Sequence, residues 1–317
     1  AEKGGYQHFM LKEIMEQPKA VADTVKPRIK NDAVVFEDNG LTDEHLREIE
    51  HIHIIGCGSA LHAGIVGKRV IEAMCRIRCT AEVASEFRYE NPIIGKKDMC
   101  IVISQSGETA DTLAAMRLAK QAGAFTIAIV NVVSSTIARE ADGVLYTWAG
   151  PEISVATTKA YSAQLSALYL ISVKIARVRG LISIGDERAL CAELQRLPEC
   201  IEQTLKCQSD MQRIATLYAN RSSVFFLGRG LDYAAALEAS LKLKEISYIH
   251  SEAYAAGELK HGTISLIEDG TLVVALATQP ALFEKTVSNI REVVARGASV
   301  VLVTTDDFTG DESVCQH

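Results

Sequence analysis

Short apolar blocks recur along the chain, and each is followed by a longer segment in which apolar and polar residues alternate at helical spacing. Apolar blocks bounded by turn residues are typical of buried strands, and strands alternating with helices indicate a parallel sheet covered by helices. In the first half, this pattern predicts strands at 51–55, 80–85, 99–104 and 126–131, and helices at 60–75 and 108–122. We therefore expect an α/β fold with a doubly wound parallel sheet.

The same pattern occurs a second time. It predicts strands at 224–227, 271–277 and 299–304, and helices at 232–249 and 283–295. Gly58 and Ser106 are 48 residues apart (106 − 58), and Gly230 and Thr278 are also 48 apart (278 − 230). Two copies of one α/β unit, offset by 172 residues (230 − 58), explain this spacing.

We expect a helical lead-in at 1–45, a first domain at 46–190, a helical linker at 191–216 and a second domain at 217–317. The longest apolar stretch, 162–176, is interrupted by polar residues and predicts a buried helix, not a membrane span. The chain begins at Ala1, and its second copy has few residues after the last predicted strand. We therefore expect a segment of a longer protein whose second domain is truncated, with an incomplete C-terminal end.

Composition and charge narrow the choice of partners. Hydrophobic residues make up 48% and charged residues 23% of the chain, which is ordinary for a globular protein. The net charge of −7 argues against a nucleic-acid or membrane partner. The eight cysteines form no CxxC pair, and no Cys/His group has zinc-ligand spacing. We therefore expect reduced thiols, a cytoplasmic location, no metal and no cofactor.

The strongest local motif is SQSGET, at the carboxyl end of the strand predicted for 99–104. Ligands of open parallel sheets bind at such strand ends, and a helix N-terminus that follows a glycine offers N–H groups to an anion. Hydroxyl and amide groups of four residues add donors: Ser104, Gln105, Ser106 and Thr109. No lysine follows, so the motif is not a nucleotide P-loop. It predicts a site for a phosphate monoester, although a well-capped helix is the plainer interpretation.

The turn Gly56-Cys57-Gly58-Ser59 ends the first predicted strand and should lie beside SQSGET. Leu61 stands where a dinucleotide-binding turn would have its third glycine, which disfavours NAD binding. Ser59 is the better candidate for a ligand contact. Cys57 is more simply a small side chain in a tight turn than a nucleophile.

Two candidate groups for proton transfer lie in the second half. Glu238, Lys242 and Glu245 share one face of the helix predicted for 232–249. Spacing alone indicates a salt-bridged solvent face, but the helix is apolar on several sides, which favours a general base. His261, in a polar run with two glycines, is a second candidate, although a loop histidine is more often simply solvated.

These stretches together resemble the isomerase portion of the glutamine–fructose-6-phosphate aminotransferase family. The matching pieces run from about Gly4 to Val303. They are HFMLKEI, IIGCGSALHAG, SEFRY, ISQSGETADTL, AIVNV, EISVATTKAY, LGRG, ALEASLKLKEISYIHSEAYAAGELKHG and NIREVVARG. The resemblance implies two tandem flavodoxin-like SIS (sugar isomerase) domains, with the active site in the first.

The resemblance also implies roles for particular residues. Phosphate would be bound by Ser104, Gln105, Ser106 and Thr109, and the sugar would contact Ser59, Val155 and Thr157. Glu245 matches the base that moves a proton between C1 and C2, and Lys242 the lysine beside it. His261 matches the histidine of ring opening, which a neighbouring subunit donates, so a homodimer is implied.

The sequence departs from the family in a few places. Ala60 replaces a serine that touches the phosphate, and Thr263 stands where proline is typical. Neither the family's glutaminase domain nor the tail lysine that forms a Schiff base matches any part of this chain. We expect the longer protein to make glucosamine 6-phosphate from fructose 6-phosphate and glutamine-derived ammonia for hexosamine biosynthesis, and this chain to be impaired. The alternatives are a related amino-sugar-phosphate deaminase or deglycase, and a non-catalytic sugar-phosphate sensor.

Overall fold

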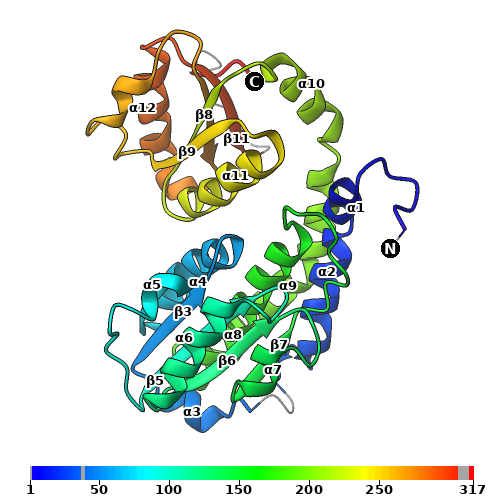
Figure 1. Ribbon diagram of the computed structural model, residues 1–317, viewed down its shortest axis with the longest axis vertical. Helices are drawn as coiled ribbons and strands as arrows, with labels where there is room; N and C mark the ends of the chain where they lie inside the picture. Colours follow the sequence, from blue (N-terminus) through cyan, green and yellow to red (C-terminus); the bar gives the residue numbers. More distant parts are fainter. Residues whose placement is uncertain (1, 37–39, 306–313) are drawn as a thin grey trace. The chain divides into compact units, whose positions relative to one another are not determined.

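The computed structural model describes residues 2–36, 40–305 and 314–317, and it divides the chain into two compact units, Ala1–Leu205 and Lys206–His317. Each unit contains a parallel sheet with helices on both faces (Figure 1). The predicted fold class, two successive doubly wound α/β units, is confirmed. The prediction of an incomplete C-terminal end rests on 305–317, of which 306–313 lie outside the described residues, and it stays a prediction.

The first sheet has five parallel strands in the order β4-β3-β5-β6-β7. They are β3 (His51–Gly56), β4 (Arg78–Val83), β5 (Asp98–Ser104), β6 (Phe125–Val130) and β7 (Gly143–Tyr146). The strand after β3 lies on one side of it and the next strand, β5, on the other. The winding direction therefore changes between β3 and β5, and a crevice at their carboxyl ends is the expected ligand position.

Helices cover both faces of the first sheet because its strands are apolar on both sides. On one face, Ile52 and Ile54 pack with α4 (Ser59–Cys75) and α8 (Lys159–Val178). On the other, Ile55 and Val102 pack with three helices, α5 (Ala84–Phe87), α6 (Ala110–Gln121) and α7 (Thr136–Glu140). The apolar stretch predicted as a buried helix forms most of α8. Within the described ranges, no helix combines the length and the apolar character needed to cross a bilayer.

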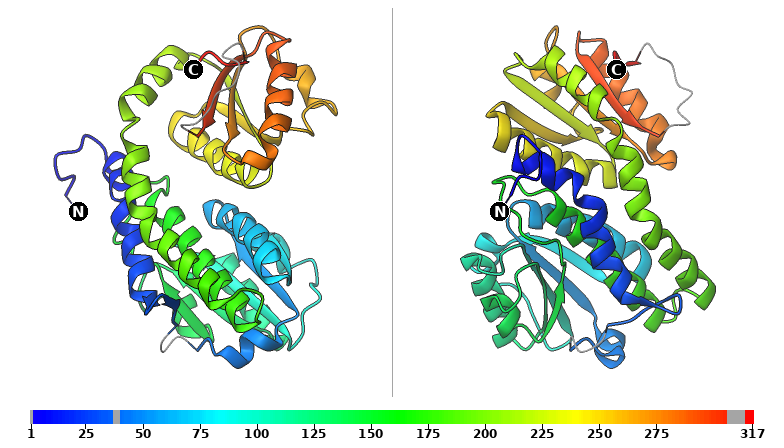
Figure 2. Two further views of the ribbon diagram at one scale, coloured as in Figure 1. Left: turned by 180° about the vertical axis from the view of Figure 1, so that it is seen from behind. Right: turned by 90° about the vertical axis from the view of Figure 1, so that its right-hand side faces the viewer.

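The lead-in belongs to the first unit. It comprises α1 (Phe9–Met15), α2 (Gln17–Val25), a short turn of 3₁₀-helix η1 (Lys26–Arg28), the hairpin of β1 (Ile29–Lys30) and β2 (Ala33–Val34), and α3 (Asp43–Glu48). Val21 and Val25 of α2 pack on Leu170 and Cys191, which places α2 along α8 and α9 (Ile184–Leu205; Figure 2). Thr42 caps α3, because its hydroxyl accepts the His45 N–H at 3.3 Å.

The second sheet has four described parallel strands in the order β9-β8-β10-β11. They are β8 (Ser223–Gly228), β9 (His250–Ala255), β10 (Leu272–Ala277) and β11 (Ser299–Thr304). Phe225 and Val273 face α12 (Phe283–Val294), and Val224 and Phe226 face α11 (Leu231–Ser247) and α10 (Gln208–Tyr218). The described part of this unit also contains two short 3₁₀ turns, η2 (Thr263–Leu266) and η3 (Pro280–Leu282).

The predicted repeat is visible in the backbone. Adding 172 to the bounds of β3, α4 and β4 gives 223–228, 231–247 and 250–255, which are the bounds of β8, α11 and β9. Both helices end at a left-handed residue, Arg76 at φ 51° and Tyr248 at φ 61°, again 172 apart (248 − 76). The two units are therefore copies of one architecture.

Some predicted boundaries are wrong. The strand predicted at 80–85 lies two residues earlier, because α5 begins at Ala84. Neither β7 nor β9 was predicted, since β7 has only four residues and β9 reads HSEAYA, with polar residues on both faces. The segment 151–158 is irregular and leads into α8.

Candidate functional site

The SQSGET loop follows β5 and is folded by its own hydroxyl groups. The Ser104 Oγ accepts the Gly107 N–H at 3.0 Å and is hydrogen-bonded to the Thr109 hydroxyl at 2.9 Å. The Ser106 Oγ accepts the Glu108 N–H at 3.2 Å. Three of the predicted phosphate ligands therefore lie together in one tight turn at the end of the strand.

Gly107 makes this turn sterically possible. Its φ is +66°, and a Cβ at this position would lie 2.0 Å from the Ser135 Oγ. The Gly107 carbonyl also accepts the Ile137 N–H at 3.0 Å, which joins the loop to the start of α7. A side chain at Gly107 would therefore displace both the loop and its neighbour.

The Gly-x-Gly turn lies beside this loop, as predicted, because β3 and β5 are hydrogen-bonded neighbours. Gly58 has φ +58° and ψ −127°, a conformation that only glycine adopts easily, and α4 begins at the next residue, the buried Ser59. The N-termini of α4 and α6 therefore both open at the carboxyl ends of neighbouring strands. Two helix N-termini favour an anion between them.

A cavity of about 540 Å³ lies next to the SQSGET loop at the ends of β5 and β6. It is lined by Gln105, Asn131, Val132, Trp148, Gly150, Pro151 and Glu152. Its volume is in the range of small-molecule sites. Gln105 is thus placed both in the predicted phosphate loop and on the wall of a cavity.

Two carboxylates organise the segment that carries Val155 and Thr157. Glu152 accepts the Thr158 N–H at 2.8 Å and the Thr157 hydroxyl, and Glu13 of α1 accepts the Ile153 N–H at 2.6 Å. Thr157 is therefore tied to a residue of the cavity wall. Val155 lies at the tip of the segment with 95% of its side chain exposed, so its contact with a sugar stays a prediction.

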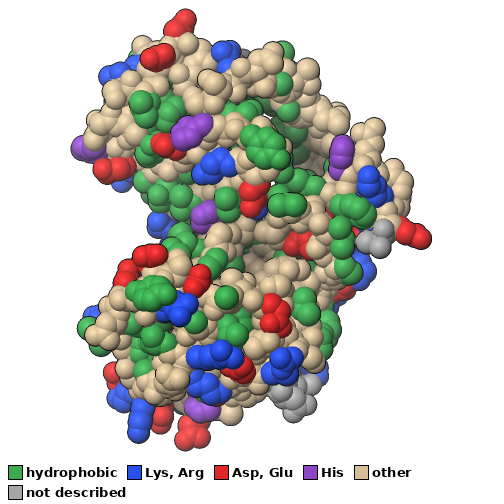
Figure 3. Space-filling view, viewed as in Figure 1, with side chains coloured by type: hydrophobic (Ala, Val, Ile, Leu, Met, Phe, Trp, Pro, Cys, Tyr) green, Lys and Arg blue, Asp and Glu red, His purple; other side chains and the backbone are tan. Residues whose placement is uncertain are grey.

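The exposed rim of the SQSGET loop carries a negative charge on Glu108. A hydrogen bond from the Thr136 N–H lowers the pKa of Glu108, which keeps a negative charge at the exposed rim of the loop. Acidic and basic side chains are interspersed over the face drawn in Figure 3. The loop would therefore attract an anion through N–H and O–H donors more than through net charge.

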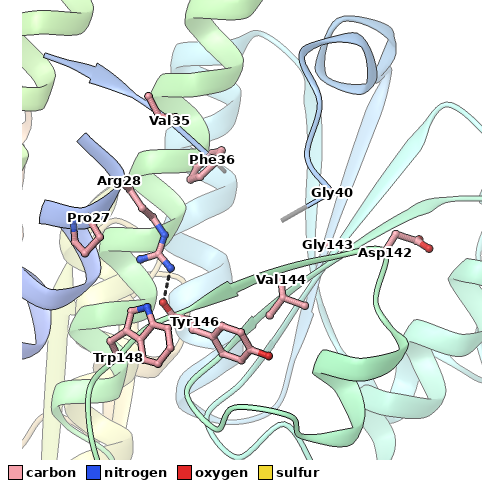
Figure 4. A pocket seen from close by; sticks show the side chains of 10 residues that line it. All are labelled: Pro27, Arg28, Val35, Phe36, Gly40, Asp142, Gly143, Val144, Tyr146 and Trp148. Atoms are coloured by element: carbon pink, nitrogen blue, oxygen red, sulfur yellow. Dashed lines mark hydrogen bonds between the residues drawn. The ribbon is translucent and has the colours of Figure 1, made fainter. Parts of the chain in front are cut away.

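Arg28 lines a second cavity, of about 490 Å³, beside β7 (Figure 4). It donates to the carbonyls of Thr24 and Tyr146, each at 2.6 Å, and burial lowers its pKa to about 10. The guanidinium therefore stays charged at neutral pH. It is a second candidate position for an anion, and sequence did not reveal it because Arg28 and Tyr146 are 118 residues apart.

In the second unit, a carboxylate occupies the position equivalent to the candidate anion site. Adding 172 to Ala60 and Ser106 gives Asp232 and Thr278. The Asp232 carboxylate accepts the Thr278 N–H at 2.9 Å and the Thr278 hydroxyl at 2.5 Å, and it is buried. A carboxylate thus takes the Thr278 donors, whereas the first unit has Ala60 at the equivalent position and no carboxylate there, which leaves the first unit as the candidate anion site.

The three predicted catalytic residues lie in the second unit. On α11, Lys242 pairs with both Glu245 and Glu238, the latter at 3.5 Å, and all three side chains are at most 29% exposed. The three charged side chains are therefore partly buried, whereas their spacing alone indicated a solvent-exposed salt bridge. His261 is exposed, in the turn between β9 and η2. The seven predicted substrate-binding residues all lie in the first unit, so a site shared with these three residues stays a prediction.

Comparison with known proteins identifies the family to which this chain belongs. The SIS domain family matches residues 45–174 and 217–311, and the chain belongs to this family. The resemblance to the isomerase portion of the glutamine–fructose-6-phosphate aminotransferases is confirmed by similarity over nearly the whole chain. The glutamine–fructose-6-phosphate aminotransferase [isomerizing] of Caldanaerobacter subterraneus subsp. tengcongensis is 58% identical over 302 residues, 95% of this chain and 50% of the relative.

Two solved structures agree with this assignment. The C-terminal domain of glucosamine-fructose-6-phosphate aminotransferase from Francisella tularensis superposes with a TM-score of 0.93 at 39% identity, covering 96% of this chain and 85% of that one. The glucosamine-6-phosphate deaminase of Thermotoga maritima gives a TM-score of 0.73 at 25% identity, covering 93% and 85%. The chain spans about half the length of the curated relatives that it matches.

Proposed function

We propose that the first unit binds a hexose 6-phosphate and that the chain is the isomerase part of a glutamine–fructose-6-phosphate aminotransferase. The observation that carries this proposal is the SQSGET loop, in which Ser104, Ser106 and Thr109 surround a helix N-terminus at the switch point of a parallel sheet. Gln105 binds the same phosphate, and Ser59, Val155 and Thr157 contact the sugar. The substrate is fructose 6-phosphate and the product is glucosamine 6-phosphate, an early intermediate of hexosamine biosynthesis.

Proton transfer belongs to the second unit in this proposal. Glu245 moves the proton between C1 and C2, Lys242 holds its carboxylate in place, and His261 of a neighbouring subunit opens the sugar ring. A carboxylate suits this step because one group can take and return the proton. The protein is then a homodimer, works in the cytoplasm, and receives ammonia from a glutaminase domain of the longer protein.

The similarity to a glucosamine-6-phosphate deaminase supports a second candidate, a deaminase acting on the same class of sugar phosphate. Both candidates need the phosphate loop and a proton-transferring carboxylate. A non-catalytic sensor would need only the loop. The paired Glu245 and Lys242, partly buried on a helix, favour an enzyme over a sensor.

Calorimetric titration of this chain tests the binding step. We expect fructose 6-phosphate and glucosamine 6-phosphate to bind and fructose to bind far more weakly, since the phosphate makes the charge-assisted hydrogen bonds. Equal affinity for fructose and fructose 6-phosphate would contradict the proposal.

Glu245→Gln tests the catalytic step in a chain extended to the full length of the relatives. Glutamine keeps the shape but cannot take a proton, so we expect isomerisation to fall about 100-fold or more while sugar-phosphate affinity is retained. Glu268→Gln, an exposed carboxylate of the same unit, is the control. Unchanged turnover in Glu245→Gln would leave Glu245 as a structural ion-pair partner.

A further inference from the structure

A second cluster of chemically active side chains lies at the amino end of the first sheet. His51 and His53 are alternate residues of β3, so their side chains share one face of the sheet. Asp98 begins β5 and is the register partner of His51. The SQSGET loop lies at the opposite end of the same strands, about 20 Å away for a six-residue strand.

The three side chains converge. Each histidine offers one ring nitrogen and Asp98 one carboxylate oxygen, and these three atoms all lie within 4.8 Å of one another. The imidazole rings are stacked with their centroids 4.1 Å apart. The His53 Nε2 lies 3.9 Å from the Asp98 Oδ2, which is too long for a hydrogen bond.

Both Nε2 atoms are buried and lack a hydrogen-bond partner among the residues that the structure describes. His53 as a whole is only 4% exposed. An unsatisfied buried polar atom destabilises the folded state, so two of them in one cluster with a carboxylate need an explanation. A cation between the three side chains would satisfy all of them.

Neighbouring groups hold the cluster in the orientation that a metal needs. The His53 Nδ1 lies 3.1 Å from the Glu82 Oε2 and 3.1 Å from the Thr80 hydroxyl. When Nδ1–H donates to Glu82, the Nε2 presents its lone pair, as in the carboxylate–histidine–zinc arrangement of many sites. The Asp98 Oδ2 accepts the Gly95 N–H at 2.6 Å, which fixes the carboxylate.

We propose that His51, His53 and Asp98 bind a divalent transition metal of the zinc type. Two imidazoles and one carboxylate match the ligands that zinc takes in open sites, with a water in the fourth position. Zinc ligands stand roughly 3.3 Å apart at the usual bond lengths, so these atoms, which lie within 4.8 Å of one another, must close by up to about 1.5 Å. His51 and Asp98 are half-buried, which gives the ion a path from solvent.

The charge balance and the position suggest what the metal does. Asp98 and Glu82 bring two negative charges, and Arg78, the register partner of His51 on β4, opposes them with one positive charge. The ion would join the amino ends of β3 and β5, which carry the two turns of the sugar-phosphate crevice at their other ends. Because it binds only the folded protein, it stabilises the first unit and leaves the crevice itself untouched.

Sequence spacing did not predict this site, since Asp98 is 47 residues from His51 (98 − 51) and lies beside it only through strand pairing.

Zinc titration of the chelator-treated chain tests the proposal. We expect one zinc ion per chain in this site and a higher unfolding temperature with zinc present. Asp98→Asn keeps an acceptor for the Gly95 N–H but loses the charge, and His51→Gln changes a half-buried position, so both should fold. Each should weaken zinc binding by about 100-fold or more and abolish the thermal shift, while Glu82→Gln should weaken it by about 10–100-fold. His8→Ala, at an exposed histidine, is the control and should bind as the unaltered chain does.

Cobalt distinguishes this site from the exposed thiols of Cys200 and Cys207. We expect a Co²⁺ spectrum without thiolate charge-transfer bands, lost in Asp98→Asn. The proposal would be overturned if Asp98→Asn and His51→Gln had the same zinc affinity and the same thermal shift as the unaltered chain. A cobalt spectrum with thiolate charge-transfer bands would also overturn it. Because the crevice residues are unaltered, neither result depends on whether a sugar phosphate binds.

Discussion

Each hydroxyl of the SQSGET loop has two possible uses, closing the turn and binding an anion. The Ser106 Oγ accepts a backbone N–H and still has its own hydrogen to donate, and the Thr109 hydroxyl is bonded to Ser104. Replacing Ser106 and Thr109 together by alanine removes two donors to a phosphate. We expect fructose 6-phosphate binding to weaken by about 1–3 kcal/mol in calorimetry. Thr204→Ala, an exposed hydroxyl of α9, is the matched control, and an unchanged affinity in the double variant would remove the loop from the site.

Gly107 allows a sharper test of the loop's geometry. Alanine there meets the Ser135 Oγ and must adopt φ +66°, whereas alanine at Gly95 meets nothing within 4 Å. We expect Gly107→Ala to lower the free energy of unfolding by about 1–3 kcal/mol, the scale of backbone strain, and Gly95→Ala to change it little. Denaturant unfolding measures both. Equal stability of the two variants would mean that the loop is not held as described.

At the scale of elements, the sequence predicts strands and loops whose residues are close together in the chain. It misses features that depend on pairing between strands. β5 was predicted because a strand buried on both faces is a continuous apolar run, and β3 because three of its six residues are isoleucine and a Gly-x-Gly turn follows. The phosphate loop was predicted because its groups lie within six residues. β9 was missed because its six residues include His250, Ser251 and Glu252. The Arg28 cavity and the histidine cluster were missed for one reason: strand pairing and helix packing bring their residues together from distant parts of the chain.

The two copies of the α/β unit are expected to differ in whether they bind a sugar phosphate. In the first copy Ala60 has no carboxylate, and in the second copy the Asp232 carboxylate, at the equivalent position, accepts from the N–H and the hydroxyl of Thr278. A second negative group would be repelled there. We therefore expect one sugar phosphate per chain by calorimetric stoichiometry, and two equivalent sites per chain would contradict this account.

At the scale of the whole molecule, the proposed role of His261 requires more than one chain. If His261 acts in a neighbour's site, the protein is at least a dimer, and twofold symmetry makes the exchange reciprocal. We expect light scattering to give the mass of a dimer. A monomer at concentrations where fructose 6-phosphate still binds would rule out the cross-subunit role of His261.

The position of the phosphate group is the most direct test of the central claim. A crystal structure of this chain with fructose 6-phosphate should place the phosphate oxygens within about 3 Å of the Ser106 and Thr109 hydroxyls, at the N-terminus of α6. The Arg28 cavity and the Asp232 turn should hold no phosphate. A phosphate bound to Arg28, or to the second unit, with the SQSGET loop empty, would contradict the account.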